Sequence, residues 1–189
     1  MTEFRSNALI ALGGNLPTCA GMPHQTLVAA VCALSKYDLR LRAVSRFFHT
    51  PCFPAGAGPD YVNALIEISS ELSAEGLLAV LHEVEAQFAR VRDQRWGMRT
   101  LDLDLIAFAG QIMPDRETYA RWLELPLAEQ MRESPDQLIL PHPRLQDRGF
   151  VLVPLCDIAP DWVHPVLGLS AREMLADLPD EAVVEVQPL

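Results

Sequence analysis

The stretch "RWGMRTLDLDLIAF", residues 95–108, decides the fold and points to the chemistry of this chain. From Leu101 onward leucines and acids alternate, which is the pattern of a β-strand with one buried and one polar face. Because successive side chains of a strand point to opposite faces, Asp102 and Asp104 share one face and lie about 6–7 Å apart. An otherwise apolar strand thus holds two like charges side by side.

This pair of acids needs a compensating charge. Two carboxylates at such a spacing repel by roughly 3 kcal/mol at an effective dielectric near 20, which is a large fraction of a domain's net stability. The stretch contains neither cysteine nor histidine, so the ion that suits it is a hard, oxygen-seeking one such as Mg²⁺, which binds one or two carboxylates together with substrate phosphates. The alternative is an ordinary edge strand whose acidic face is solvated and paired with arginines of the preceding helix.

The basic residues are unevenly placed. Of the fifteen, fourteen are arginine, and Arg90, Arg92, Arg95 and Arg99 fall within ten residues that contain one acid. Guanidinium groups match the geometry of phosphate oxygens. Acids that hold a metal ion, next to arginines that hold phosphates, predict a site for magnesium and a polyphosphate.

Composition limits the remaining possibilities. A chain of 189 residues and 21.0 kDa favours a single domain, and a net charge of −10 argues against nucleic acid and anionic membranes as partners. No apolar run reaches the roughly 18 residues of a membrane helix, and the first residues lack the features of a signal peptide. The four cysteines are widely spaced without a CxxC pair, which predicts reduced thiols. We therefore expect a cytoplasmic protein.

The order of predicted elements up to residue 108 is β-α-β-β-α-β. Apolar patterns predict strands at 7–12, 39–48, 61–70 and 100–108, and helices at 25–35 and 73–92, the second capped by Ser73. Gly13-Gly14-Asn15 is expected to be a turn, and the Pro- and Gly-rich residues 49–60 a loop. This order predicts a ferredoxin-like α+β fold, with an antiparallel sheet packed on helices.

The rest of the chain adds to this core. Residues 110–137 are polar, with helical pieces that include Trp122, and residues 138–155 combine a short strand, a Pro-containing turn and an apolar run. A last helix is expected at 170–178, and residues 182–186 are expected to add an edge strand.

Two segments together resemble the signature sequences of a known family. "RWGMRTLDLDLIAF" and "LPHPRLQDRGFVLVPL" (140–155) are similar to those of the 6-hydroxymethyl-7,8-dihydropterin pyrophosphokinases, and "ALIALGGNL", "YVNALIEI" and "IAPDWVHPVLG" extend the likeness over about residues 7–179. The resemblance implies a ferredoxin-like fold and the transfer of pyrophosphate from ATP to the hydroxymethyl group of the pterin, with release of AMP, in folate biosynthesis.

The resemblance also implies roles for individual residues. Asp102 and Asp104 would bind two Mg²⁺ ions. The residues expected at ATP are Glu85, Arg90, Trp96, Arg99, His142 and Arg148, with Arg90, Arg99 and both aspartates counted as catalytic. Those expected at the pterin are Tyr61 and Phe150, stacked on its two faces, and Asn63 at its edge. Which of Arg90, Arg92 and Arg95 contact phosphate stays open.

Two other functions fit parts of the same pattern. One is a magnesium-dependent kinase or nucleotidyltransferase that acts on another small ring compound, and the other is a ferredoxin-like regulatory module that binds a ligand without catalysis. The segment 111–137 is about 20 residues longer than the corresponding connection in the family. We expect it to be an insertion in a single domain, and to act as a lid or a subunit contact.

Overall fold

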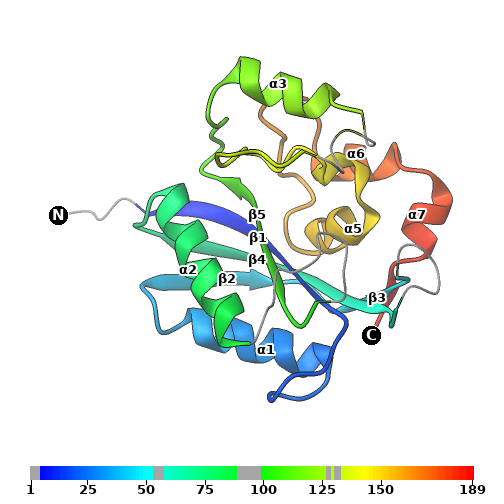
Figure 1. Ribbon diagram of the computed structural model, residues 1–189. Coiled ribbons are helices and arrows are strands. Elements are labelled where there is room, and N and C mark those ends of the chain that lie inside the picture. Colours follow the sequence, from blue (N-terminus) through cyan, green and yellow to red (C-terminus); the bar gives the residue numbers. More distant parts are fainter. Residues whose placement is uncertain (1–4, 53–57, 89–98, 127–128, 130–132) are drawn as a thin grey trace.

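The computed structural model describes residues 5–52, 58–88, 99–126, 129 and 133–189. In this part of the chain one sheet with antiparallel pairing runs in the order β5-β1-β4-β3-β6, and β2 pairs with the other half of β4 (Figure 1). Its strands are β1 (Ser6–Gly14), β2 (Leu39–Val44), β3 (Phe48–Thr50), β4 (Tyr61–Ser70), β5 (Asp102–Phe108) and β6 (Gln187–Pro188). The predicted fold is confirmed, since β5, β1, β4 and β2 with two connecting helices form the ferredoxin-like arrangement.

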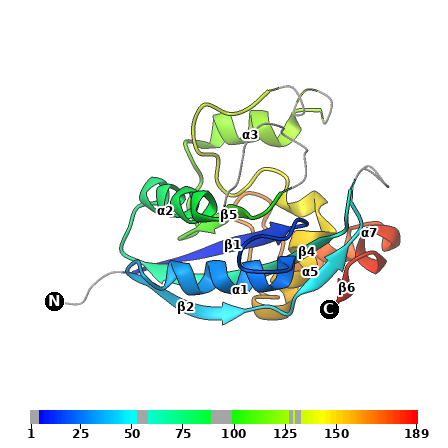
Figure 2. The same cartoon turned by 60° about the horizontal axis from the view of Figure 1, so that its bottom comes forward.

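The connecting helices cover one face of the sheet. Helix α1 (Pro23–Leu34) connects β1 to the segment of β2, and helix α2 (Ala74–Gln87) connects β4 to the segment of β5 (Figure 2). Leu27, Leu77 and Leu81 pack with Ile10 and Ile66 in the main core. The predicted cap of α2 is present, because the Ser73 hydroxyl accepts a hydrogen bond from Gly76 N at 3.1 Å.

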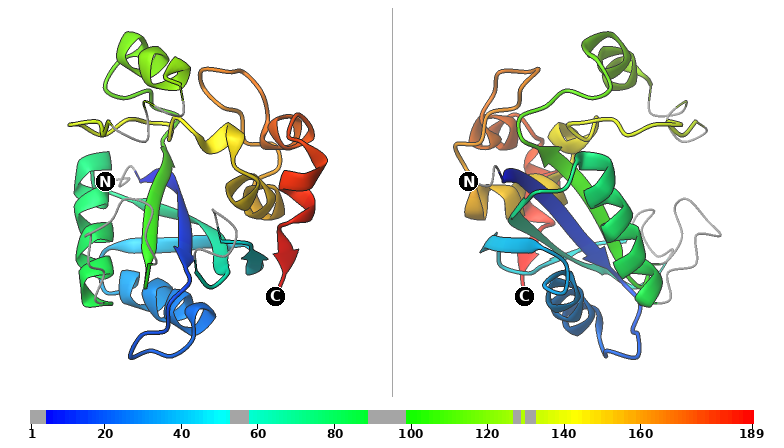
Figure 3. Two further views of the ribbon diagram at one scale, coloured as in Figure 1. Left: turned by 45° about the vertical axis from the view of Figure 1, so that its right-hand side comes forward. Right: turned by 90° about the vertical axis from the view of Figure 1, so that its left-hand side faces the viewer.

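The other face of the sheet is covered by the C-terminal part of the chain. Here the apolar run after residue 148 forms helix α5 (Gly149–Ile158), which packs with helix α6 (Ala171–Ala176) on the opposite side from α1 and α2 (Figure 3). A second core joins Leu9, Leu65 and Ile106 of the sheet to Leu152 and Leu155 of α5. The central strand β4 is therefore buried on both faces, which explains why its sequence has few charged residues.

The segment 111–137 contains helix α3 (Arg116–Glu124), which lies above the sheet in Figure 1. Tyr119 and Trp122 are buried in a small core of their own with Ile139. The Tyr119 hydroxyl lies 3.1 Å from Nε2 of the buried His164. This segment is thus attached to the body by apolar packing and by a buried polar contact.

Four sequence expectations on secondary structure are wrong in detail. Residues 182–186 belong mainly to helix α7 (Asp180–Val184) and not to an edge strand, because Asp180 and Glu181 in the first turn favour a helix start over the strand propensity of the valines. The strand expected at 39–48 is interrupted after Val44, and the second piece, β3, includes His49 and Thr50, which we expected in a loop.

The remaining two differences concern short segments. Gly13 and Gly14 continue β1 instead of forming a turn, since both pair with β4. The short strand expected after residue 137 is only an isolated bridge between Met113 and Leu140.

The C-terminal tail closes the second face. Strand β6 pairs with β3, and the carbonyl oxygen of Ala182 in α7 lies 2.1 Å from the position that a Cβ of Gly149 would occupy. Only glycine fits at residue 149, because any side chain would collide with the α7 backbone. None of the helices in the described ranges is long and apolar enough to cross a membrane.

Candidate functional site

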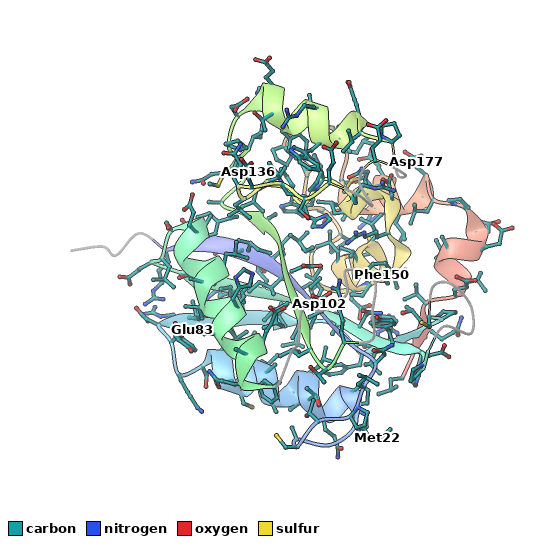
Figure 4. All side chains as sticks on the ribbon, in the orientation of Figure 1. Met22, Glu83, Asp102, Asp136, Phe150 and Asp177 are labelled. Atoms are coloured by element: carbon teal, nitrogen blue, oxygen red, sulfur yellow. The ribbon has the colours of Figure 1, made fainter. Side chains whose placement is uncertain are left out.

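A small hollow at the ends of the central strands brings together four of the residues expected at the site. Asp102 and Asp104 of β5, Asn63 of β4 and Phe150 of α5 line it, together with Ala11, Leu12 and Gly13 of β1. Asp102 and Phe150 lie close together near the centre of the molecule in Figure 4. The acids expected at a metal thus share a surface with side chains expected at a ring compound.

The alternation of β5 places both aspartates on the α5 face of the sheet. Leu103 and Leu105 are buried in the core beneath α1 and α2, whereas Ile106 belongs to the core beneath α5. Asp102 and Asp104 share the face of Ile106, and both stay partly exposed. The predicted split into a buried and an acidic face is confirmed.

Glu85 holds the strand between the two aspartates. It is 1% exposed, and its Oε1 accepts a hydrogen bond from Leu103 N at 2.7 Å. Leu103 pairs with Leu12 on the other edge of β5, so this backbone N–H would otherwise lack a partner in the sheet. At least one carboxylate oxygen of Glu85 therefore acts as a hydrogen-bond acceptor for the backbone of β5.

Arg99 is paired with one of the two acids. It forms an ion pair with Asp102, and the two side chains are 26% and 16% exposed. Burial lowers the pKa of Arg99, but the charges of Asp102 and Asp104 outweigh this effect, so its pKa is raised and it stays a cation. Arg99 offsets part of the repulsion between the carboxylates.

Asn15 connects the segments that border the hollow. Its Oδ1 accepts a hydrogen bond from Arg99 N at 2.8 Å, and its Nδ2 donates to Pro59 O at 3.0 Å. Asn15 N also donates to Arg99 O at 2.9 Å. Asn15 is 2% exposed and fixes the backbone before β5 against the backbone before β4. Sequence reasoning did not select it, although an amide directly after a glycine pair was a usable signal.

His142 is brought to the site along the outer edge of β5. Its backbone N donates to Ile106 O at 2.8 Å, and its Nδ1 accepts from Arg144 N at 3.1 Å. Burial, followed by the positive charge of Arg148, lowers the pKa of His142 to about 3. The ring is therefore neutral at pH 7 with its proton on Nε2, which can donate to a phosphate oxygen.

Arg148 and Phe150 flank the start of α5. The guanidinium carbon of Arg148 lies 5.5 Å from the centre of the Phe150 ring, a cation–π contact. Burial lowers the pKa of Arg148, while the negative charge of Asp104 opposes the shift. Phe150 is 39% exposed, which leaves its ring accessible to a planar ligand.

The amide of Asn63 is fixed by a second residue that sequence reasoning missed. Nδ2 of Asn63 donates to the Thr50 hydroxyl at 2.6 Å, which fixes the amide and leaves Oδ1 able to accept a hydrogen bond from a ligand. This Oδ1 lies 2.8 Å from the position that a Cβ of Gly13 would occupy, so glycine is required there. Thr50 was assigned to a loop, and only the pairing of β3 with β4 brings it to Asn63.

Tyr61 begins β4 on the same face as Asn63, two residues away. Burial raises the pKa of its hydroxyl, while the charge of Arg99 acts in the opposite direction. It does not contribute to the wall of the hollow. Arg90 and Trp96, along with Arg92 and Arg95, lie outside the described residues.

The donor set at the hollow fits magnesium. Asp102 and Asp104 supply carboxylate oxygens, and among the described residues no third acid, histidine or cysteine joins them in a cluster that could hold a metal alone. Mg²⁺ is usually bound by one or two carboxylates and completed by water and substrate phosphates. Two acids next to Arg99, in a surface open on one side, match that description.

Comparisons with known proteins agree with this geometry. Residues 9–160 match the family described as 7,8-dihydro-6-hydroxymethylpterin-pyrophosphokinase (HPPK). Two relatives named 2-amino-4-hydroxy-6-hydroxymethyldihydropteridine pyrophosphokinase are from Synechocystis sp. and Haemophilus influenzae. The first is 35% identical over 96% of this chain and 80% of its own length, and the second is 34% identical over 96% and 98%.

A solved structure shows the same fold. The Plasmodium falciparum HPPK-DHPS, crystallised with pterin and p-hydroxybenzoate, superposes with a TM-score of 0.65 at 13% identity over 93% of this chain. The present chain spans 44% of that longer protein. Because the family pattern covers residues 9–160 and full-length relatives share about a third of the sequence, the chain belongs to the 7,8-dihydro-6-hydroxymethylpterin-pyrophosphokinases of folate biosynthesis.

Proposed function

We propose that this pyrophosphokinase transfers the β,γ-pyrophosphoryl group of ATP to the hydroxymethyl oxygen of 6-hydroxymethyl-7,8-dihydropterin and releases AMP. The observation that carries the proposal is the shared hollow, in which Asp102 and Asp104 face Asn63 and Phe150. A reaction between a metal-bound polyphosphate and a flat ring compound needs these two kinds of side chain side by side.

Asp102 and Asp104 are the proposed ligands of two Mg²⁺ ions. Bound there with ATP, magnesium would neutralise phosphate charge and favour ionisation of the attacking hydroxyl group. The chain's own contribution is to hold both carboxylates in place, through the strand geometry and through the hydrogen bond from Leu103 to Glu85. The ion pair with Arg99 would orient the Asp102 carboxylate.

Arg99, Arg148 and His142 are the proposed contacts for the phosphates of ATP among the described residues. The arginines would balance negative charge, and His142 would donate one hydrogen bond from a neutral ring. Glu85, Arg90 and Trp96 complete the proposed ATP site. Glu85 also supports the strand, and the roles of Arg90 and Trp96 follow from the sequence alone.

Phe150 and Tyr61 are proposed to stack on the two faces of the pterin, and Asn63 to bind its edge. Because Nδ2 of Asn63 is engaged by Thr50, the edge that it recognises should present an N–H donor to Oδ1. The partly exposed ring of Phe150 supports such stacking.

Catalysis in this proposal needs no nucleophilic side chain. Phosphoryl-type transfer asks a protein for positioning and for neutralisation of charge. Asn63 and Phe150 would place the hydroxymethyl oxygen, while the aspartates and arginines would align the polyphosphate against it.

The remaining parts of the proposal concern the whole chain. We propose one domain over residues 1–189, with 111–137 as an insertion. Because Tyr119 and Trp122 anchor this insertion in a buried core, we favour a role as a subunit contact and not as a hinged lid. Four free cysteines agree with a reducing compartment, and we propose the cytoplasm.

Identification of the nucleotide product tests the proposal. Incubation with ATP, Mg²⁺ and the pterin should yield AMP, whereas ADP would mean phosphoryl transfer and free pyrophosphate would mean nucleotidyl transfer. Arg99→Ala should lower kcat more than tenfold, or about 1.4 kcal/mol, by removing a charge next to the reacting phosphates. Arg172→Ala is the control, since Arg172 pairs with the exposed Asp161 and does not line the hollow of Asp102 and Asp104. Equal loss in both variants would contradict the assignment.

A further inference from the structure

A second, larger hollow lies apart from the site described above. Its volume is about 370 Å³, and it lies between the 3-10 turn η1 (Leu145–Asp147), the loop before α6, and the end of α6. We call it the α6 hollow. Figure 4 shows Asp177, one of its wall residues, well away from Asp102. Its volume is within the range of sites that take small molecules.

The walls of the α6 hollow are apolar. Leu167, Leu169, Met174 and Leu178 line it, and all except Met174 remain partly exposed. Such a surface gains free energy when it is covered by an apolar group. A ligand of this hollow therefore needs an apolar body.

The charge at the hollow is negative. Asp147 and Asp177 both line it, and no lysine or arginine of the described ranges does. Asp147 is paired with Nε of Arg144 at 2.7 Å, but the Asp177 side chain makes neither an ion pair nor a hydrogen bond with the described residues. The charge that complements this wall is positive.

One polar atom next to the hollow lacks a partner. Nε2 of Gln146 donates to Pro143 O at 3.0 Å and is 3.3 Å from Oδ2 of Asp147. Oε1 of Gln146 is buried and accepts no hydrogen bond from the described residues. An unsatisfied buried acceptor costs free energy, so rotation of this amide toward a bound N–H donor would be favourable.

We propose that the α6 hollow binds a small organic cation, with its ammonium or guanidinium group at Asp147 and Asp177 and its apolar body against the leucines and Met174. Both carboxylates repel an anion. A neutral apolar compound can cover the leucines but supplies no positive charge to Asp177, so it should bind more weakly than a cation.

This second site is connected to the first through η1. Leu145 N donates to His142 O at 3.0 Å, Arg148 N donates to Leu145 O at 3.3 Å, and Arg144 N donates to Nδ1 of His142 at 3.1 Å. A cation at Asp147 competes with Arg144, whose backbone orients the His142 ring. Occupation of the α6 hollow should therefore change the affinity for ATP, a coupling that rests on the proposed function of His142 and Arg148.

The binding test uses phenethylammonium as the probe and the full chain labelled with ¹⁵N. We expect saturable shifts of backbone amides confined to residues 146–147, 167–169 and 174–178, with a Kd of about millimolar for a ligand of this size. The neutral 2-phenylethanol should bind at least about threefold more weakly, and 3-phenylpropanoate should not bind. Equal binding of the cation and the neutral compound would overturn the proposal.

A matched pair of variants separates the site from general electrostatics. Asp177→Asn should raise the Kd of the probe about threefold, whereas Asp161→Asn, which removes an exposed acid outside the hollow, should not. An equal effect of both changes would overturn the site. For the coupling, a saturating probe should change the KM for ATP at least twofold and leave the KM for the pterin unchanged. An unchanged KM for ATP refutes the coupling alone, and the NMR result stands whatever reaction the enzyme performs.

Discussion

The carboxylate of Glu85 accepts a hydrogen bond from the backbone of Leu103, the residue between the two aspartates, at 2.7 Å. A buried acid on a helix therefore supports the strand that carries the two partly exposed aspartates.

Replacing Glu85 with alanine should lower the free energy of unfolding by about 1–3 kcal/mol, because Leu103 N would lose its acceptor. Urea denaturation measures this loss. Glu85→Gln keeps an acceptor oxygen and should lose less; equal losses would mean that the strand contact is unimportant.

Substitution of the two aspartates should affect protein stability differently, although both residues are expected to be needed for turnover. Asp104→Asn removes repulsion and should leave the melting temperature without metal unchanged or raised, whereas Asp102→Asn removes the ion pair of Arg99 and should lower it. Both variants should lose magnesium-dependent activity. Thermal unfolding in EDTA and a product assay give the two readouts. Near-normal activity of both variants would refute the metal assignment.

Thr50 should affect the pterin and not ATP. Thr50→Val keeps the shape of the side chain but removes the acceptor that holds Nδ2 of Asn63. A freed amide can rotate, so the KM for the pterin should rise about five- to tenfold, equivalent to about 1–1.4 kcal/mol, while the KM for ATP should not change. Thr50→Ser restores the hydroxyl and should restore binding. A change in the KM for ATP alone would contradict this role.

The burial of His164 should make stability depend on pH. Nδ1 of His164 accepts hydrogen bonds from Val166 N and Leu167 N, both at 3.2 Å, so the ring must be neutral in the folded protein. Burial lowers its pKa to about 4, while an unfolded histidine titrates near 6.5. The unfolded state therefore binds a proton first as the pH falls. This contribution to stability is complete above about pH 6.5 and is lost between pH 6.5 and 4.

Urea titrations of two variants isolate this effect. The difference in unfolding free energy between the unmodified protein and His164→Phe should shrink by about 1–3 kcal/mol from pH 7 to pH 4. Tyr119→Phe keeps the imidazole and its backbone donors, so its pH dependence should match that of the unmodified protein while its stability is lower by about 1–3 kcal/mol throughout. A pH-independent difference for His164→Phe would contradict the assignment of a neutral ring.

Local patterns predicted the elements whose sequences reflect a single strong environment. The strand at 61–70, the cap at Ser73 and the two faces of the acidic strand agree with the structure because burial alone sets those patterns. The three-residue strand β3 could not be predicted, since it exists only by pairing with β4 and with β6, and β6 is distant in sequence.

The candidate site divides in the same way. The aspartates, Asn63 and Phe150 were found from the sequence and meet in one hollow. Asn15 and Thr50 were missed because their value lies in hydrogen bonds to residues 84 and 13 positions away. Side chains that orient other side chains are harder to recognise from a sequence than side chains that carry charge.

The close approach of Ala182 to Gly149 and the pairing of β6 tie the last residues of the chain to two elements next to the hollow of Asp102 and Asp104. One element is the helix start that carries Phe150, and the other is β3, which pairs with β6 and supplies Thr50 as the hydrogen-bond partner of Asn63. A purification tag or a fused partner placed directly after Leu189 would disturb the pairing of β6 with β3 and the contact between Ala182 and Gly149. Tags for work on this enzyme therefore belong at the opposite terminus, or behind a long flexible spacer.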